Sequence, residues 1–243
     1  MYYPKHVVKI SIALISLLIF LSCQPDKQAT KVEPNNPSDT SKLVHEEQLA
    51  PDVSADNDED EERAYWQKPN LVLSKLGPLE NKTIADIGAG MGYFSFELAK
   101  RKAKKVIAID IDKDMLKALN YFKNLMEEKE KNFGERFEVR LAQTDDSNLK
   151  ENEVDIILIV NTVAYIENRI DYLTQLRNTI KDDGQIIIVD YKTKKLPEYI
   201  NAPSYEDRIY LHVIEEQLEA AGFTNITSDD TTLDYQFIVI AQK

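Results

Sequence analysis

Three glycines that follow a short apolar stretch are the first residues whose types and spacing could do chemistry. The stretch 83–87 contains Asp86, and residues 88–92 then read Gly-Ala-Gly-Met-Gly. Glycines at such a place let a ligand approach the backbone and allow a tight turn into a helix N-terminus. The pattern predicts a small-molecule site after a strand, although a purely structural glycine-rich turn would have the same composition.

The spacing of these glycines separates two classes of cofactor. A dinucleotide pyrophosphate is bound by G-x-G-x-x-G, a pattern that needs a small residue at position 93. The chain has the bulky Tyr93 there and reads G-x-G-x-G instead. An acidic residue before that pattern suits a cofactor without phosphate. A nicotinamide-dependent oxidoreductase is therefore disfavoured.

Further acidic residues follow the next two predicted strands. Asp110 ends the second apolar stretch, which is where an α/β cofactor fold binds ribose hydroxyls. Asp112 could take the same role, but we interpret it as the cap of the next helix. After the third strand, residues 145–149 form a polar turn at the edge where open α/β sheets bind ligands. An ordinary Asp/Asn turn would have the same sequence.

The remaining pattern predicts a scaffold that brings these strand ends together. Apolar strands are expected at 83–87, 106–109, 137–141, 156–160 and 185–189, the last after a turn at 183–184. Helices are expected at 60–76, 94–101, 169–180 and 211–221, and Pro69 should start a second piece within the first of them. A further helix is expected after Asp112, with Met115, Leu119, Phe122 and Met126 on one face. Alternation of strands and helices predicts a doubly wound, mostly parallel α/β sheet of the Rossmann-like kind. Segments 223–228 and 233–241 have no helix between them and predict an antiparallel hairpin at one edge.

The first residues of the chain are typical of an export signal. Lys5 and Lys9 precede an apolar run at 10–21, which is too short to span a bilayer comfortably. Ser22-Cys23 after that run resembles the lipobox of bacterial lipoproteins, although Phe20 departs from the usual leucine. In that family the cysteine is diacylated, and two acyl chains provide stable anchoring. An uncleaved signal anchor with an incidental cysteine is the alternative.

Charge and composition set the remaining limits. The net charge of −12 divides into +2 for residues 1–23, −9 for 24–62 and −5 for the rest. We expect a signal peptide at 1–22, a lipidated cysteine and acidic disordered linker at 23–60, and one globular domain at 61–243. One cysteine and three histidines exclude a disulfide scaffold and leave no expected metal site. The acidic balance disfavours nucleic acid as a partner, and we interpret the basic run 100–105 as a solvated face.

Over residues 61–243 the chain resembles the class I S-adenosylmethionine-dependent methyltransferases, which have a seven-stranded sheet with an antiparallel last strand. The resemblance implies S-adenosylmethionine as the cofactor. It implies that the loop 88–92 lines the methionine part and that Asp86 holds the amino-acid end, directly or through water. Asp110 would bind the ribose, Asp145 the adenine amino group, and Asn161 would face the reactive side. The full set of implied cofactor-binding residues is Asp86, Gly88, Ala89, Gly90, Gly92, Asp110, Ile111, Asp145, Asp146 and Asn161.

A finer resemblance is to a methyltransferase subgroup found with export signals. It is carried by Arg63, by Trp-Gln-Lys-Pro at 66–69 and its spacing to residues 86–90, and by three short segments: Asp145-Asp146, Val154-Asp155 and Asp190-Tyr191-Lys192. In that subgroup the fourth strand is commonly followed by paired histidines, whereas residues 162–166 here read Thr-Val-Ala-Tyr-Ile. The alternative to an active enzyme is an inactive ligand-binding or interaction module on the same fold. Export motivates this alternative, because we expect S-adenosylmethionine to be made and held in the cytosol, and the missing histidines also favour it.

The methyl acceptor is not specified by the sequence. We expect a small molecule, a lipid or an envelope protein, met by a lipoprotein on the periplasmic or surface side of a bacterial membrane. The segment 192–206 is the expected substrate lid. Side chains near the mouth that could act as a base are Tyr165, Asp190, Tyr191 and Tyr205, each of which could equally be packing. The domain has no cysteine for covalent catalysis.

Overall fold

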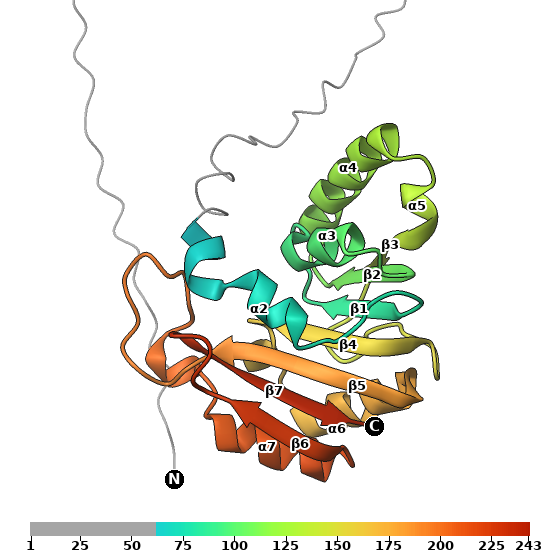
Figure 1. The fold of residues 1–243 in the computed structure, drawn as a ribbon. Coiled ribbons are helices and arrows are strands. Elements are labelled where there is room, and N and C mark those ends of the chain that lie inside the picture. The colour runs from blue at the N-terminus through green and yellow to red at the C-terminus, as the bar shows by residue number, and fades with distance from the viewer. Residues whose placement is uncertain (1–61) are drawn as a thin grey trace, which may run out of the picture. The chain divides into compact units, whose positions relative to one another are not determined.

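The computed structural model describes residues 62–243, which form one α/β unit (Figure 1). The expectations for residues 1–61, including the signal peptide, Cys23 and the linker, lie outside the described residues. Within 62–243 a single sheet has the strand order β3-β2-β1-β4-β5-β7-β6. Its strands are β1 (Thr83–Ile87), β2 (Lys105–Asp110), β3 (Phe137–Leu141), β4 (Val154–Val160), β5 (Ile180–Tyr191), β6 (Thr224–Asp229) and β7 (Gln236–Gln242).

The strand order reverses at β1, which pairs in parallel with β2 on one side and with β4 on the other. At such a switch point the connections leave the sheet in opposite directions, so a crevice opens beyond the carboxyl ends of the strands. β7 runs antiparallel to both β5 and β6. The predicted fold, a mostly parallel seven-stranded sheet with an antiparallel C-terminal strand, is confirmed.

Helices cover both faces of the sheet (Figure 1). Alternate residues of β5 show the two layers, because Ile186 packs in one core cluster and Ile187 in the other. The helices are a segment at 62–67, then α2 (Pro69–Ser74), α3 (Tyr93–Lys100), α4 (Lys113–Lys129), α5 (Phe133–Arg136), α6 (Arg169–Thr179) and α7 (Leu211–Ala220), with the 3₁₀ turns η1 (Val163–Tyr165) and η2 (Tyr205–Asp207). The helices α2 to α5 pack on one face, and α6 and α7 pack on the other. No helix in this part of the chain is both long and apolar enough to cross a membrane.

Two expected details differ from the structure. The turn at 183–184 is absent, because β5 continues through Gly184 where its pairing with β4 shifts register. A Cβ on Gly184 would lie 2.6 Å from the carbonyl oxygen of Asp155, so the glycine permits this irregularity. On α4, Leu116 is buried and Met115 is exposed, although periodicity placed Met115 on the buried face. Leu116 and Leu119 are the buried residues of this helix, so its buried face begins at Leu116.

Candidate functional site

The glycine loop after β1 combines one closed position and one open one. Gly88 and Gly90 have positive φ angles of 74° and 55°, which favour glycine. A Cβ on Gly88 would lie 2.2 Å from Oγ1 of Thr162, so the loop packs directly against the segment after β4. A Cβ on Gly90 would meet no atom within 4 Å. The backbone at Gly90 is therefore open to a ligand lying over the end of the sheet.

Asp110 ties the end of β2 to this loop. Its Oδ2 accepts a hydrogen bond of 2.8 Å from the backbone N–H of Gly90, and its Oδ1 accepts one of 2.9 Å from Asp112. Each carboxylate oxygen keeps a lone pair that can accept from a hydroxyl group. Asp112 caps α4 by accepting from the backbone N–H groups of Asp114 and Met115, as the sequence predicted.

Asp86 lies beneath the loop and is almost fully buried. Its Oδ2 accepts a hydrogen bond of 2.6 Å from the hydroxyl group of Ser95 on α3. Burial raises the pKa of Asp86 from 3.8 to about 6, against the opposing effects of the Ser95 hydrogen bond and the positive charge of Arg63. The Arg63 guanidinium lies 4.3 Å from the centre of the Tyr93 ring, on the loop side of the helical segment 62–67.

Asn161, directly after β4, is the centre of a second polar group. It has a positive φ of 55°, and its Nδ2 donates to the hydroxyl group of Tyr191 over 3.1 Å. The Tyr191 hydroxyl in turn donates to the carbonyl oxygen of Asn201 over 3.2 Å. On its other side, Oδ1 of Asn161 accepts from Nε2 of Gln236 at the start of β7. These bonds join the ends of β4, β5 and β7 to the segment that follows β5.

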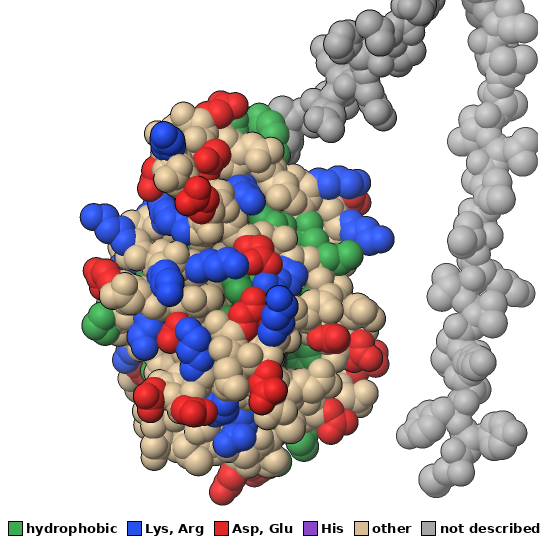
Figure 2. Space-filling model, turned by 90° about the vertical axis from the view of Figure 1, so that its right-hand side faces the viewer, with side chains coloured by type: hydrophobic (Ala, Val, Ile, Leu, Met, Phe, Trp, Pro, Cys, Tyr) green, Lys and Arg blue, Asp and Glu red, His purple; other side chains and the backbone are tan. Residues whose placement is uncertain are grey.

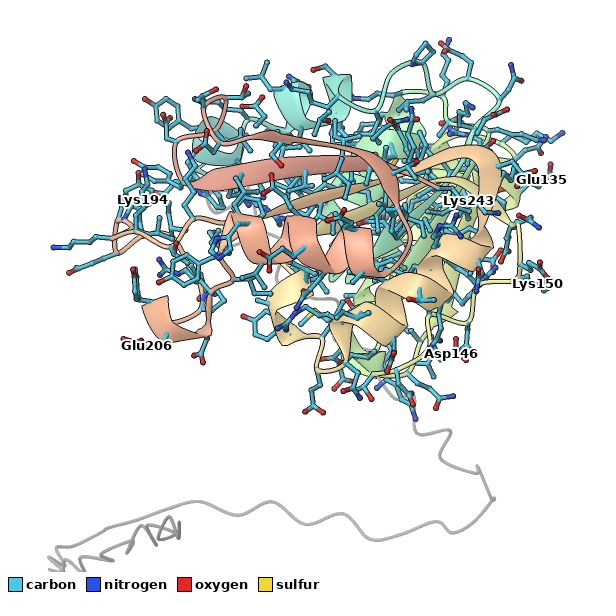
Figure 3. The ribbon with its side chains drawn as sticks, turned by 90° about the horizontal axis from the view of Figure 1, so that it is seen from below. Glu135, Asp146, Lys150, Lys194, Glu206 and Lys243 are labelled. Carbon is cyan, nitrogen blue, oxygen red and sulfur yellow. The ribbon has the colours of Figure 1, made fainter. Side chains whose placement is uncertain are left out.

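An aromatic cluster closes the same end of the sheet. The rings of Trp66 and Tyr191 stack with their centres 6.1 Å apart, and Ile200 belongs to the same buried cluster. The loop after β5 thus contacts the helical segment 62–67, and Figure 1 shows the two beside each other at the tip of β5. In Figure 3, Lys194 marks this end of the molecule, and Glu135 and Lys150 mark the opposite end. Residues 192–206, which we expect to form the lid, follow the end of β5, and Asn201 in this segment accepts a hydrogen bond from Tyr191.

Asp190 does not share the face of Tyr191. Neighbouring residues of a strand point to opposite faces, and the register partner of Asp190 is Phe237, which packs with α6 and α7. Its Oδ1 accepts from the backbone N–H of Tyr191 over 2.7 Å. Burial raises the pKa of Asp190 to about 6, although the backbone N–H groups of Tyr191, Ala164 and Val163 favour the charged form. The structure therefore places Asp190 against η1, away from the Asn161 group.

The turn after β3 and the segment after β4 lie beside each other. Asp145 and Tyr165 line a cavity of about 310 Å³ between them. Asp146 is exposed and accepts from the backbone N–H of Asn148, which is ordinary turn chemistry. Tyr205 is exposed on η2 and hydrogen-bonds to Tyr210, apart from the Asn161 group. Of the sequence-predicted side chains that could act as a base, only Tyr191 joins that group.

The basic run 100–105 connects the end of α3 to the start of β2, so it lies at the amino end of that strand. Lys100 pairs with Glu97 at 2.7 Å and Lys105 with Glu138 at 2.6 Å. On the face shown in Figure 2, basic and acidic side chains are interspersed. The run therefore has the contacts of a solvated surface.

Comparison with known proteins assigns the fold to a family. A family model described as a methyltransferase domain matches residues 78–232, which is more than half of the chain. The chain belongs to the methyltransferase domain family. The matched residues contain the glycine loop, Asp110, the turn after β3 and Asn161.

Individual relatives of this methyltransferase domain are distant. The chain is 25% identical over 186 residues to a tRNA U34 carboxymethyltransferase of Actinobacillus succinogenes, covering 70% of this chain and 54% of the relative. It is 23% identical over 182 residues to phosphoethanolamine N-methyltransferase 1 of Zea mays, covering 70% of this chain but 33% of the relative. The chain thus spans a third to about half of these relatives. A SAM-dependent methyltransferase from Aquifex aeolicus has a similar structure, with a TM-score of 0.67, 24% identity, and coverage of 78% of this chain and 96% of that one.

Two buried amides of the methyltransferase domain were missed as site residues by sequence reasoning. Gln67 and Gln236 are fully buried, and within the described residues Nε2 of Gln67 and Oε1 of Gln236 have no hydrogen-bond partner. Gln67 accepts from Nε of Arg63 over 2.6 Å. Its place in the Trp-Gln-Lys-Pro motif was a signal that could have found it. Gln236 carried no local signal, because its role depends on where β7 inserts.

Proposed function

We propose that this chain is an S-adenosylmethionine-dependent methyltransferase, held to a bacterial envelope membrane by lipidated Cys23. Its acceptor would be a small molecule, a lipid or an envelope protein. The observation that carries the proposal is the hydrogen bond from the backbone N–H of Gly90 to the carboxylate of Asp110, in a chain of the methyltransferase domain family. That bond places an acid, with lone pairs to spare, beside the open backbone of the glycine loop.

The residues at the strand ends fit the cofactor. The open position at Gly90 leaves room beside the backbone, and buried Asp86 lies below it for the amino-acid end. Asp110 would bind the ribose hydroxyls, and Ile111 beside it offers an exposed apolar side chain. Asp145 would hold the adenine amino group. The proposed contacts are Asp86, Gly88, Ala89, Gly90, Gly92, Asp110, Ile111, Asp145, Asp146 and Asn161.

When bound, S-adenosylmethionine supplies a methyl group that is already activated on a sulfonium. The protein's part is alignment and exclusion of water. The stacked rings of Trp66 and Tyr191 and the side chain of Ile200 exclude water at the end of the sheet. Asn161 fixes the hydroxyl group of Tyr191 and the amide of Gln236 in single orientations. These side chains would orient an acceptor rather than react with it.

Membrane attachment is supported by the sequence at residues 5–23. A basic start, an apolar run and Ser22-Cys23 together suit export and lipidation. An inactive binding module is the alternative, motivated by the absence of histidines from residues 162–166.

Calorimetric titration tests the proposal. The purified full chain is titrated with S-adenosylmethionine and with S-adenosylhomocysteine. We expect micromolar binding that Asp110→Ala weakens at least about tenfold, since a hydrogen bond to a charged group contributes about 1.5–3 kcal/mol. Asp114→Ala is the matched control, because Asp114 lies four residues away and pairs with Lys117 on the exposed face of α4. No binding of either compound by the folded chain would reject the cofactor and with it the proposed activity.

A further inference from the structure

We propose that the acceptor subsite lies at Gln236, where the Asn161 group meets the aromatic cluster, and that it takes an amine. This inference rests on the proposed function and names the substrate class for that same site. It is carried by a buried hydrogen-bonded chain that ends in one unpartnered carbonyl oxygen.

The direction of each hydrogen bond in the chain is fixed by its last acceptor. The backbone carbonyl of Asn201 can only accept, so the Tyr191 hydroxyl donates to it. That hydroxyl must then accept from Nδ2 of Asn161, which turns Oδ1 of Asn161 toward Gln236. Gln236 therefore donates through Nε2 and leaves Oε1 unpaired. The amide orientation of Gln236 follows from chemistry, and the atom it presents is an acceptor.

The unpaired oxygen belongs to the reactive end of the proposed cofactor site. Asn161 is bonded to Gln236, and the next residue, Thr162, packs on Gly88 of the glycine loop. Gln236 is also the register partner of Tyr191, so both side chains lie on the face covered by Trp66. Gln236 is 0% exposed. A buried carbonyl oxygen without a partner is normally avoided, which indicates that a donor group completes this site.

Among the described residues, no side chain that could act as a base hydrogen-bonds to Oε1 of Gln236. Asp190 points to the opposite face of the sheet, and Asp86 is held by Ser95 beneath the glycine loop. The hydroxyl group of Tyr191 already donates to Asn201, and burial raises its pKa to about 12. A carboxamide oxygen accepts a hydrogen bond but does not remove a proton at neutral pH.

A neutral amine is the nucleophile that needs only such an acceptor. An aliphatic amine is mostly protonated at neutral pH, so its ammonium form first releases a proton to water and the neutral form binds. Its N–H donates to Oε1 of Gln236 while its lone pair forms the new N–C bond to the methyl carbon. The C–S bond breaks, its electron pair stays on sulfur as a thioether, and the resulting ammonium group later loses a proton to water. A hydroxyl group would have to lose its proton during attack, which calls for a general base.

The test uses probes that carry one amine and one hydroxyl group: ethanolamine, tyramine and phenylalaninol. Each is incubated with the full chain and S-adenosylmethionine labelled with ¹³C on the methyl group, and NMR identifies the atom that receives the label. We expect label on nitrogen of at least one probe. Gln236→Leu should lower that transfer roughly tenfold or more, as expected when a hydrogen-bonding subsite is lost. Gln185→Leu is the control, because Gln185 is an amide at the opposite end of the same sheet whose Nε2 bonds to Leu76.

Binding of S-adenosylhomocysteine distinguishes failure of the proposed function from failure of the amine inference. If the wild-type chain does not bind it, the proposed function fails before the acceptor is in question. If it binds normally but labels no probe, or labels oxygen, the amine inference is overturned. Equal loss of transfer in the Gln236 and Gln185 variants would also overturn it, since the effect would then come from the sheet.

Discussion

Asp190, like Asp86, is a residue at which burial and charge conflict. Its folded-state pKa of about 6 lies above its ordinary value of 3.8. Between these two pH values the folded chain therefore keeps a proton on Asp190 that the unfolded chain releases. The free energy of unfolding should therefore fall as the pH rises from about 4 to about 6, by about 3 kcal/mol from this carboxyl alone. In Asp190→Asn this part of the pH dependence should be absent. Urea denaturation at several pH values between these limits measures the difference between the two chains.

The control for that measurement is Asp182→Asn. Asp182 is on the same strand, but its side chain is 96% exposed and pairs with Lys243 over 3.3 Å. Any fixed cost of placing an amide at position 190 shifts the stability at every pH and leaves the slope untouched. Parallel stability curves for the wild-type and Asp190→Asn chains would contradict the prediction.

The spacing of residues along the sequence was enough to predict contacts between segments that are close in the chain. The glycine loop and Asp110 follow two consecutive strands, and any parallel pairing of those strands brings them together. The cap at Asp112 is likewise local. Gln236 and Asn161 are 75 residues apart in the sequence, and they meet because β5 and β7 pair. No local sequence pattern encodes that contact.

Among the elements, the loop after β5 is held by few polar contacts to the sheet. The Tyr191 hydroxyl bonds to Asn201 within the loop and to Asn161 at the end of β4. Tyr191→Phe keeps the ring that stacks on Trp66 but removes both bonds. We expect unfolding to become easier by about 1–2 kcal/mol. Faster amide hydrogen exchange in residues 192–204, measured by mass spectrometry, should accompany this loss.

Tyr172→Phe provides the comparison for Tyr191→Phe. Tyr172 is a buried tyrosine of α6 on the opposite face of the sheet. Its loss of a hydroxyl group should leave exchange in residues 192–204 unchanged. If both variants loosen the segment equally, the loop is held by the general stability of the domain and not by the Tyr191 hydroxyl.

The observed boundaries of strands and helices show which features the sequence pattern predicts and which it does not. The strand 137–141 was predicted at its observed limits because it is a compact β-rich run. The turn at 183–184 was wrong because Asp-Gly is also compatible with a bulged strand, and the pairing with β4 decides between them. On α4 the pattern fixed the helix but not its rotation at the first turn, which is set by tertiary contacts.

At the scale of the molecule, the alternation of strands and helices was sufficient for the α/β class. The placement of β7 between β5 and β6 needed the structure, and it is this insertion that delivers Gln236 to the end of β4. The helical segment 62–67 closes the same end from the start of the described chain. Three segments remote in sequence thus build the proposed acceptor subsite, whereas the proposed cofactor contacts all come from residues 86–161.

Attachment of the whole molecule to a membrane depends, in our proposal, on one atom: the sulfur of Cys23. Because the chain has a single cysteine, Cys23→Ser removes the only thiol that could be acylated. One or more acyl chains bind a bilayer by burying methylene groups, at about 0.8 kcal/mol each. In a bacterial host fed radiolabelled palmitate, the wild-type chain should carry label and sediment with membranes. Cys23→Ser should lose the label, whereas Ser16→Ala, inside the apolar run, should keep it. Label that persists without the cysteine would contradict lipidation at this residue. Membrane association that persists without label would instead indicate an uncleaved anchor at 10–21.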